Sequence, residues 1–393
     1  MMIDPTYPRV ALIGNIANVG YGFAKALRRA GVDASLIPSD LEWTGSRPNT
    51  SAAVTDSPFN EDEEPLRAAI GQPYSTRLFP RLVRKLEMET GLAQFTDIYR
   101  RVRHADVIQA HTGAAIWAAR IHRRSGCPYV AVTTGADITE LAFERSRLSR
   151  AYRGALRSAS MILLGNTNHW HYAERLGLDP SRLAFLPFAI DCDFFAGLND
   201  ERREQGEVRF FSVARLDWSQ TWRNSVKRND IFIRALGRYV AECPLQRVEL
   251  RIADWGVDRM ATRELIASAG LTGHTEFVPT GSKERLLAEY QAADVVVDQF
   301  HAGSAGLSCL EAMAAGKPVL IRWDSAAAQR SYGELPPVLN VASEEDALAM
   351  IREAADASRR REIAASARSW VRRYHGQLAV AKRLLGYYEQ ART

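Results

Sequence analysis

One stretch of the sequence decides the fold: residues 303–319 read GSAGLSCLEAMAAGKPV. An apolar strand is expected before it, at residues 294–297, and a second one at residues 319–321. A loop of small residues therefore opens a helix that returns to a parallel strand, and peptide N–H groups at such a helix start attract phosphate. Glu311, eight residues beyond Gly303, could reach the hydroxyls of a ribose whose phosphates rest on the loop. The simpler alternative is an ordinary βαβ crossover whose small residues serve packing alone.

The rest of the chain repeats this alternation of strands and helices. With 393 residues, of which 46% are hydrophobic and 25% charged, the composition is that of a globular protein long enough for two domains. Residues 9–14 and 32–37 are expected as strands around a helix at 21–30, and a second series of strands starts at residues 210–213. The sequence therefore predicts an α/β protein with two consecutive doubly wound units.

Composition also bears on the possible partners. The four cysteines are widely spaced and form no CxxC pair, so the sequence gives no case for a zinc site or a disulfide framework. The net charge is +5, and the positive excess lies in residues 1–190, which hold 23 Lys and Arg against 18 Asp and Glu. This excess favours an acidic or membrane-proximal partner for that part and is too mild to indicate nucleic acid.

Targeting and membrane signals are weak. Residues 1–9 lack the apolar core of a signal peptide, and no run approaches the 18 apolar residues of a membrane span, so we expect a cytoplasmic protein. Residues 77–86 form a basic amphipathic stretch that could lie on an anionic membrane surface. Such a segment is more often a surface helix that packs its apolar face inward.

The stretch quoted first resembles the donor-binding motif of the GT-B glycosyltransferases, specifically family 4 (glycosyl transferases group 1). That family has an acidic residue, seven further residues and a Glu, followed by Ala-Met-Ala-x-Gly-x-Pro-Val. Residues 306–319 match this pattern closely, with Glu311 as the Glu, whereas Gly303 stands where the first acid is expected.

The resemblance implies a GT-B fold, with two Rossmann-like domains that face a cleft. Residues 1–188 would form the acceptor-side domain, residues 189–375 the nucleotide-sugar domain, and residues 376–393 a helix that packs back on the first domain. The implied activity is retaining, metal-independent transfer from a UDP- or GDP-linked sugar to a small-molecule, glycan or lipid-linked hydroxyl acceptor, without a cofactor. A catalytically silent sugar-nucleotide-binding protein and a GT-B sugar-nucleotide 2-epimerase are the alternatives.

Arg215 and Lys227 resemble the family pattern Gly-Arg-Leu…Lys-Gly and are candidate catalytic residues. Arg215 ends an expected strand, and Lys227 precedes an expected helix. Positive side chains at such positions can neutralise a diphosphate leaving group. Between them, residues 217–226 are longer than the usual loop, and Trp218 and Trp222 could either stack on a base or sugar or pin the loop to its domain.

The donor-binding candidates lie on one loop, and the missing acid leaves three interpretations. Glycine at position 303 is compatible with activity in a subset of similar sequences that have Asp-Gln at the preceding strand end, as here at 298–299. Alternatively, Asp298 or His301 supplies the sugar contact, or catalysis has been lost and only binding remains. The predicted donor-binding residues are Glu311, Gly303, Ser304, Ala305, Gly306, Leu307, Asp298 and His301.

Acceptor-side candidates begin in the first turn of the chain. Asn15, Asn18 and Gly20 suit a tight backbone turn, which in the family lies under the donor diphosphate or the acceptor. A plain packing turn is the alternative. His111 ends the expected strand at 106–110, and the resemblance places a His near this position, close to the acceptor, so it is a candidate catalytic residue. It could equally be a structural histidine.

Two further acceptor-side candidates follow later strands. Gly135 and Asp137 match the family pattern His-Gly-x-Asp or Arg-Gly-x-Asp, although Thr134 does not. Asp137 would bind acceptor hydroxyls or a cation, or it would cap the turn that follows. Asn166 lies where family members carry a polar residue near the acceptor.

Overall fold

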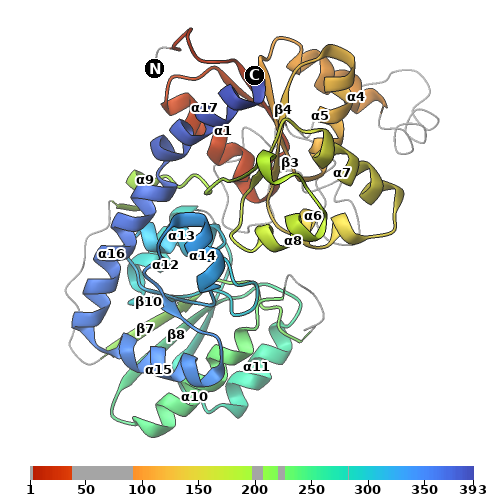
Figure 1. The fold of residues 1–393 in the computed structure, drawn as a ribbon. Coiled ribbons are helices and arrows are strands. Elements are labelled where there is room, and N and C mark those ends of the chain that lie inside the picture. Colours follow the sequence, from red (N-terminus) through yellow and green to blue (C-terminus); the bar gives the residue numbers. More distant parts are fainter. Residues whose placement is uncertain (1–2, 38–91, 197–206, 220–225, 282) are drawn as a thin grey trace, which may run out of the picture. The chain divides into compact units, whose positions relative to one another are not determined.

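The computed structural model describes residues 3–37, 92–196, 207–219, 226–281 and 283–393. The contacts between Cα atoms divide the chain into two units, here named unit 1 (residues 1–189 and 377–393) and unit 2 (residues 190–376). Figure 1 shows the helices and strands of both. The basic stretch at 77–86 and Trp222 lie outside the described residues.

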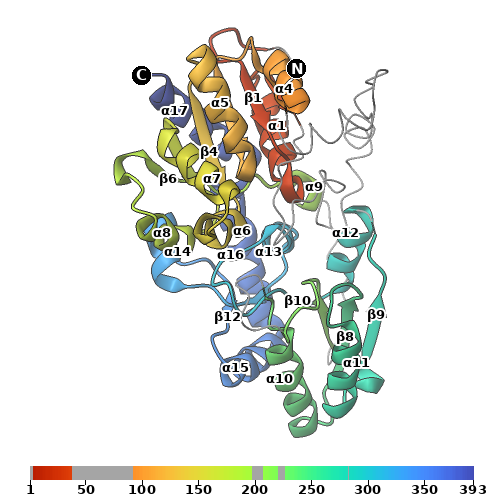
Figure 2. The ribbon, with the colours of Figure 1, turned by 90° about the vertical axis from the view of Figure 1, so that its right-hand side faces the viewer.

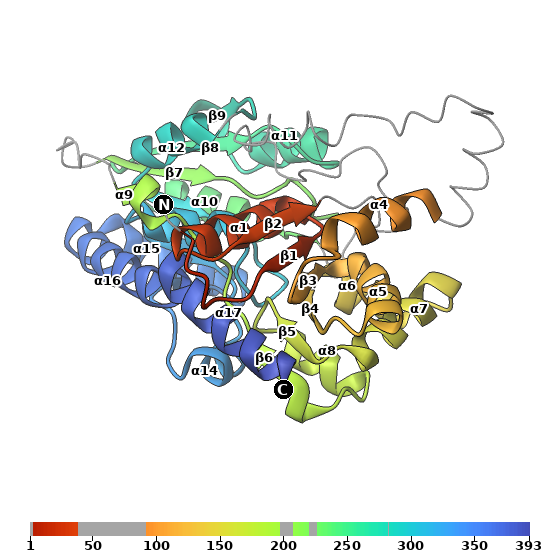
Figure 3. The ribbon, with the colours of Figure 1, turned by 90° about the horizontal axis from the view of Figure 1, so that it is seen from above.

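Unit 1 is built on a sheet of six strands, which are parallel in every neighbouring pair. Figure 3 shows them side by side in the order β2-β1-β3-β4-β5-β6. Four of the six are buried along their whole length, as expected for strands covered on both faces. The strands are β1 (Val10–Ile13), β2 (Ala34–Ile37), β3 (Val107–His111), β4 (Tyr129–Thr133), β5 (Met161–Leu164) and β6 (Leu183–Phe185).

Helices cover this sheet, and the last of them comes from the C-terminal end of the chain. The hydroxyl group of Tyr388 donates to the Oε1 atom of Gln109 on β3, and that of Tyr387 donates to the carbonyl oxygen of Phe185 (2.9 Å). The last helix, α17, also packs along the first, α1 (Figure 1). The helices of unit 1 are α1 (Val19–Arg29), α4 (Leu92–Val102), α5 (Ala115–Ser125), α6 (Ala136–Thr139), α7 (Arg147–Ser158), α8 (His169–Arg175) and α17 (Gln377–Arg392).

Unit 2 repeats the architecture with a second six-stranded parallel sheet in the order β12-β11-β10-β7-β8-β9. Its core is formed by apolar side chains such as Phe210, Leu250 and Val297. The strands are β7 (Glu207–Ser212), β8 (Arg247–Ala253), β9 (Thr275–Val278), β10 (Val295–Val297), β11 (Val319–Ile321) and β12 (Leu339–Asn340). The predicted α/β class with two doubly wound sheets is confirmed.

The helices of unit 2 follow its strands in turn. In Figure 2, α10 lies between α15 and α11, and it contacts both. The helices are α9 (Cys192–Ala196), α10 (Asn229–Glu242), α11 (Arg259–Ser268), α12 (Lys283–Ala292), α13 (Leu307–Ala314), α14 (Ser325–Tyr332), α15 (Glu344–Ala355) and α16 (Ala357–His375).

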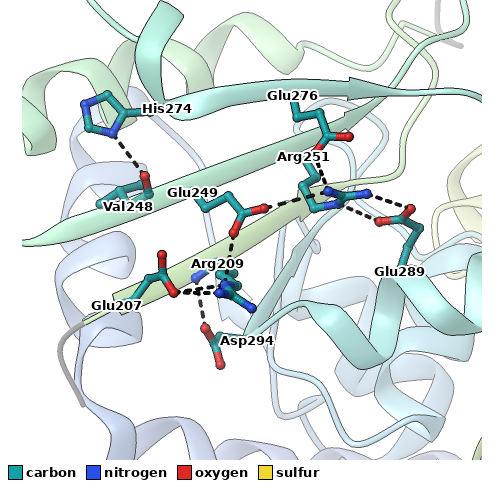
Figure 4. Close-up of polar contacts among 9 residues, drawn as sticks. All are labelled: Glu207, Arg209, Val248, Glu249, Arg251, His274, Glu276, Glu289 and Asp294. Atoms are coloured by element: carbon teal, nitrogen blue, oxygen red, sulfur yellow. Dashed lines mark hydrogen bonds and ion pairs between the residues drawn. The ribbon is translucent and has the colours of Figure 1, made fainter. Parts of the chain in front are cut away.

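A charged network crosses one side of the β7-β8-β9 sheet and reaches helix α12 (Figure 4). Because strand residues alternate between faces, Phe210 and Leu250 enter the core while Arg209 and Arg251 point away from it. Arg251 binds both carboxylate oxygens of Glu289 on α12, at 2.8 and 3.1 Å, and therefore anchors that helix to the sheet. The network comprises Glu207, Arg209, Glu249, Arg251, Glu276, Glu289 and Asp294, and His274 nearby donates to the carbonyl oxygen of Val248.

The strand order of each sheet fixes where a ligand can bind. In unit 1 the chain runs outward in both directions from neighbouring strands β1 and β3, and in unit 2 it does so from β7 and β10. At such a switch point the loops after two adjacent strands diverge and leave a crevice at the carboxyl ends. The loops after β1, β3, β7 and β10 are therefore the places to look for a site.

Candidate functional site

The loop after β10 is shaped by Gln299, whose importance the sequence did not reveal. Its buried side chain accepts hydrogen bonds from the N–H groups of His301 (3.1 Å) and Ala302 (2.7 Å) and donates to the carbonyl oxygen of Ser304 (2.5 Å). One amide side chain thus pairs three backbone groups of the loop that have no strand beside them to bind. The loop is held in a fixed shape before helix α13 begins at Leu307.

Gly303 has a left-handed backbone with φ of +68°. A Cβ atom at this position would lie 3.4 Å from the Cβ atom of Asp324, which is ordinary contact, so space is not the constraint. The constraint is the left-handed backbone conformation, because residues with a Cβ atom adopt it only at a cost in free energy. Ser304 and Ala305 are buried beside it, and Gly306 precedes the helix with an extended backbone.

Asp298 is buried against the first turn of α13. One of its carboxylate oxygens accepts a hydrogen bond from the N–H of Cys309, and the other, Oδ2, is buried without a hydrogen-bond partner among the described residues. Burial raises the pKa of this carboxyl, while Lys227 and the Cys309 N–H act in the opposite direction. Asp298 therefore already caps the helix and faces Lys227.

Arg215 follows β7 and is held by a neighbouring carboxylate. Its Nη2 atom lies 3.1 Å from the Oδ2 atom of Asp217, whose side chain is only 2% exposed. The guanidinium itself is about one-third exposed. Asp217 thus positions a charged group that still reaches solvent at the crevice.

Lys227 lies half-buried at the same edge of the sheet. Burial lowers the pKa of its ammonium group, with Arg215 acting in the same direction and the carboxylates of Asp298 and Asp217 opposing them. Within the described part of the chain, no carboxylate lies within ion-pair distance of its Nζ atom. A partly desolvated ammonium near other cations is suited to an anionic ligand.

The insertion before Lys227 is closed at its base. The N–H of Lys227 donates to the carbonyl oxygen of Asp217 at 2.6 Å, and the N–H of Asp217 donates to the side chain of Asn229 at 3.3 Å. Trp218 is pinned to its domain, since its indole N–H donates to Thr262 at 3.0 Å and its main-chain N–H to Asp258 at 2.6 Å. For Trp218, the pinned alternative is therefore the one observed.

Arg228 stands where the family pattern Gly-Arg-Leu…Lys-Gly has its last glycine. It has φ of +56°, a conformation that favours the glycine of the pattern, and its guanidinium forms two hydrogen bonds with Asp230, at 2.9 and 3.1 Å. Around it, the exposed His301 has a pKa lowered first by partial desolvation and then by Arg228, Arg322 and Lys227. Arg322 follows β11 and was not predicted. The crevice after β7, β10 and β11 is therefore a concentration of positive charge.

Glu311 lies in the second turn of α13 and is buried. Its Oε1 atom forms an ion pair with the Nζ atom of Lys283, the first residue of α12. The sequence reasoning missed Lys283, because nothing in the spacing links it to Glu311. Among all the described residues, no group of three or more His, Cys, Asp or Glu side chains could hold a metal ion.

In unit 1, the first turn is built on close backbone packing. Gly14 has φ of +92°, and a Cβ atom on Gly20 would lie under 3.0 Å from the carbonyl oxygen of Gly14. Asn15 is fully buried, with its Oδ1 atom accepting from the N–H of Tyr21 (2.6 Å) and its Nδ2 atom donating to Asn18 (3.2 Å). These contacts favour the packing-turn interpretation for Asn15 and Gly20, and Asn18 is nearly as buried.

His111 lies at the end of β3, at the switch point, but it is fully buried. Its ring stacks on Phe23 at 5.7 Å, and burial lowers its pKa to about 3, so the imidazole is neutral. Its Nε2 atom accepts from the side chain of Gln109 at 3.0 Å, which leaves the proton on Nδ1. Full burial and the stacking on Phe23 favour the interpretation of His111 as a structural histidine, and its contact with an acceptor stays a prediction.

Thr112, which was not predicted, is strained beside His111. It has φ of +52°, which is rare for a β-branched residue, and its hydroxyl oxygen is buried without a partner in the described chain. Strain of this kind is stored most often at functional sites. Ala17 and Asn18 in the loop after β1 also have positive φ, so both loops at the switch point of unit 1 carry backbone strain.

Asp137 is used within unit 1. Its Oδ1 atom accepts from the N–H groups of Thr134 (3.1 Å) and Gly135 (2.7 Å), and its Oδ2 atom accepts from the hydroxyl of Tyr152 (2.6 Å). Burial raises its pKa to about 6. These N–H groups precede Asp137, and the N-cap of α6 is Gly135 without a side-chain cap bond, so Asp137 does not cap the turn that follows it. Its contact with an acceptor stays a prediction. Asn166 is half-buried and donates to the carbonyl oxygen of Thr134 at 3.0 Å.

The predicted residues thus form two groups. In unit 2 the structure brings Arg215, Lys227, Asp298 and the loop from Gly303 to one edge of the sheet, with Glu311 just inside α13. In unit 1 the predicted residues also follow β1, β3, β4 and β5, but most of them are buried. Across the described residues, no helix is both long enough and apolar enough to cross a membrane.

Comparison with known families supports the same assignment for both halves. The family model described as "Glycosyl transferase 4-like domain" matches residues 16–189, and the one described as "Glycosyl transferases group 1" matches residues 200–327. The two matches together leave out residues 1–15, 190–199 and 328–393.

The similar curated proteins are D-inositol 3-phosphate glycosyltransferases. The protein of Geodermatophilus obscurus is 32% identical over 155 residues, which cover 37% of this chain and 34% of that protein. That of Acidothermus cellulolyticus is 26% identical over 238 residues (55% and 51%), and that of Mycobacteroides abscessus is 26% identical over 317 residues (73% and 69%). The chain thus spans a third to about half of the first two relatives and about two-thirds of the third.

Solved structures share the fold over nearly the whole chain. Anabaena HepE in complex with UDP has a TM-score of 0.65 at 16% identity, covering 96% of this chain and 98% of that one. Sucrose-phosphate synthase from Thermosynechococcus elongatus has a TM-score of 0.64 at 18% identity, covering 97% and 98%. Both halves match the family models, and the whole chain shares the fold of these structures; the chain belongs to the GT-B glycosyltransferases of group 1.

Proposed function

We propose that this protein is a retaining, metal-independent glycosyltransferase that moves a sugar from a nucleoside-diphosphate sugar to a hydroxyl acceptor. The observation that carries the proposal is the Lys227 ammonium, which is half-buried at the switch point of unit 2 and has no ion-pair partner in the described chain. Arg215 and the start of α13 lie at the same edge. This combination is suited to a diphosphate group.

In the proposed reaction, the bond between the anomeric carbon and the donor phosphate oxygen breaks, and its electron pair stays on the diphosphate. The acceptor hydroxyl oxygen forms the new bond to the anomeric carbon from the same face, and its proton is lost to the departing phosphate oxygen. Arg215 and Lys227 stabilise the negative charge that develops on that oxygen. Side chains already fixed by Asp217 and by burial need little reorganisation during this step.

The donor is the better supported of the two substrates. HepE, which shares the fold, binds UDP and UDP-glucose, so we propose a UDP-sugar here, with a GDP-sugar as the alternative. Glu311 would bind the ribose. The curated relatives are named for transfer to D-inositol 3-phosphate, which points to a hydroxylated small molecule as one acceptor class, beside glycans and lipid-linked hydroxyls.

Gly303 favours one second candidate, a protein that binds the sugar nucleotide without turning it over. The family acid is missing there, and the left-handed backbone does not suit an acidic side chain. Retention of Arg215, Lys227 and Glu311 in one crevice argues for activity, since binding alone does not require two leaving-group cations.

The test is a thermal-shift screen of UDP-glucose, UDP-galactose, UDP-N-acetylglucosamine and GDP-mannose, followed by a measurement of nucleoside-diphosphate release with an acceptor panel. A donor at 100 times its Kd adds about 2.7 kcal/mol to the free energy of unfolding, a clear rise in Tm. Lys227→Ala should lower the rate of diphosphate release by roughly 10²–10³. Stabilisation by a donor without release in any acceptor mixture would favour the silent binder, and no stabilisation by any donor would refute both functions.

A further inference from the structure

The pair formed by Lys283 and Glu311 is a costly arrangement of charge beside the proposed donor site. The two side chains are only 13% and 7% exposed. Removing two charges from water costs several kcal/mol, which their mutual attraction repays only partly. Lys283 is also the first residue of α12, where the positive end of the helix dipole opposes a cation. Stability therefore does not explain this pair.

The ammonium group of Lys283 is fixed from several directions. Helix α12 is tied to the sheet through Glu289 and Arg251 (Figure 4) and to the start of α13 by the hydroxyl of Tyr290, which donates to the carbonyl oxygen of Ser308 at 3.0 Å. The ring of Phe195, on α9, lies 6.0 Å from the Nζ atom, at the limit of a cation–π contact. The helix that carries Lys283 is thus fixed to the sheet and to α13, and Phe195 lies beside its ammonium group.

The Glu311 carboxylate is held by only one of its oxygens. Oε1 is bound to Lys283, and Oε2 makes no polar contact with any other described residue and is not sealed from solvent. A carboxylate oxygen can accept more than one hydrogen bond, so the pair leaves capacity for a hydroxyl ligand. Lys283 also cancels a negative charge that would otherwise lie close to the phosphate-binding loop.

We propose that Lys283 is a positioning residue that holds Glu311 in the orientation that recognises a ribose, and that it thereby sets the preference of the site for ribonucleotides over 2′-deoxyribonucleotides. This inference rests on the proposed function, because it assumes that Glu311 faces the ribose of a bound nucleotide. Lys283 itself need not touch the nucleotide. Its effect passes through the geometry and charge of the Glu311 carboxylate.

The experiment measures Kd by calorimetry for UDP and 2′-deoxy-UDP on the full chain. GDP and 2′-deoxy-GDP take their place if the wild type binds only guanine nucleotides. We expect the wild type to prefer the ribonucleotide by about tenfold or more, the scale of a hydrogen bond to a charged group. Lys283→Met should reduce this preference to about threefold or less, and Lys283→Arg should restore it. Because the two ligands are compared on the same protein, partial unfolding of a variant does not change their ratio.

Lys317→Met is the matched control, since it removes the same charge from a lysine beyond the opposite end of α13 and should leave the preference unchanged. A Lys283→Met variant that keeps the full preference overturns the inference and leaves the proposed function intact. An increased preference for the ribonucleotide in Lys283→Met also overturns the inference, because Lys283 would then compete with the ribose for Glu311. A wild type that binds neither nucleotide refutes the proposed function itself, and the inference with it.

Discussion

The N–H of Asp324 donates a hydrogen bond to the carbonyl oxygen of Gly303 at 2.9 Å, and this bond ties the loop after β10 to the start of α14. Asp324 in turn caps α14 by accepting from the N–H of Ala327 at 2.9 Å. The position at which the family carries an acid is therefore occupied by a left-handed residue with its own structural contact. Gly303 is part of a loop with defined hydrogen bonds. Random loss of an acid would not be expected to leave such a loop.

Gly303→Glu should lower turnover of the native donor by about tenfold or more, because the substituted residue strains a backbone with φ of +68° and adds negative charge beside phosphate. Gly273→Ala, in the turn before β9, is the control, since Gly273 lies outside the predicted site and has open space around its Cβ position. Steady-state release of nucleoside diphosphate measures both. Activity of the Glu variant at or above wild type would leave Gly303 without a role.

Removing Arg215 or Lys227 should affect chemistry more than binding. If they stabilise charge on the leaving diphosphate, Arg215→Ala and Lys227→Ala each lose roughly 10²–10³ in kcat with a smaller change in donor Kd. Arg209→Ala removes a cation from the same strand region but from the charged network away from the carboxyl edge, and it should leave kcat nearly unchanged. Near-normal kcat in both single variants would remove them from the mechanism.

Glu311→Ala should weaken binding of the nucleoside diphosphate by about 1.5–3 kcal/mol, which is the range for hydrogen bonds to a charged group. It also leaves Lys283 as a partly buried, unpaired cation, so the unfolding temperature should fall as well. Calorimetric titration and thermal unfolding separate the two effects. Unchanged affinity in a folded variant would contradict the role in ribose binding.

Two carboxylates of unit 1 should give opposite pH dependences of stability. Burial raises the pKa of Asp137 to about 6, so its contribution is complete below pH ~4 and is lost as the pH rises to ~6. The hydrogen bond from Arg9 lowers the pKa of Asp106, so its contribution is present at neutral pH and is lost on acidification.

The measurement is the difference in Tm between wild type and variant from pH 3.5 to 7. This difference should shrink with rising pH for Asp137→Asn and grow for Asp106→Asn. Parallel slopes for the two variants would show that the burial of Asp137 does not control its ionisation.

Two glycine substitutions in helices of unit 1 should shift stability in opposite directions. Gly20→Ala places a Cβ atom against the carbonyl oxygen of Gly14 and should destabilise the protein by about 1–3 kcal/mol. Gly154→Ala, in α7, meets open space and should stabilise it by about 0.4–1 kcal/mol through helix propensity. Chemical denaturation measures both, and a neutral Gly20→Ala would show that the first turn has room to move.

The sequence was sufficient to predict the parallel sheets, the start of α13 and the strand-end positions of the site residues, because these depend on local periodicity and on small residues. It did not indicate which of them are covered. The burial of His111, at the end of strand β3, involves Phe23 on helix α1, and the partner of Glu311 is 28 residues away on α12. The sequence showed that Arg228 occupies a glycine position of the pattern. Only the structure showed that its backbone is left-handed.

Helix α17 has a consequence for how the protein is made. It supplies the hydroxyl of Tyr388 to Gln109 and packs on α1, so unit 1 lacks part of its covering until residues 377–392 have left the ribosome. Unit 2 is continuous in the chain and is synthesised entirely before that moment. During translation, the second unit can therefore complete its core while the first still waits for its last helix, the reverse of the order in which their strands are translated.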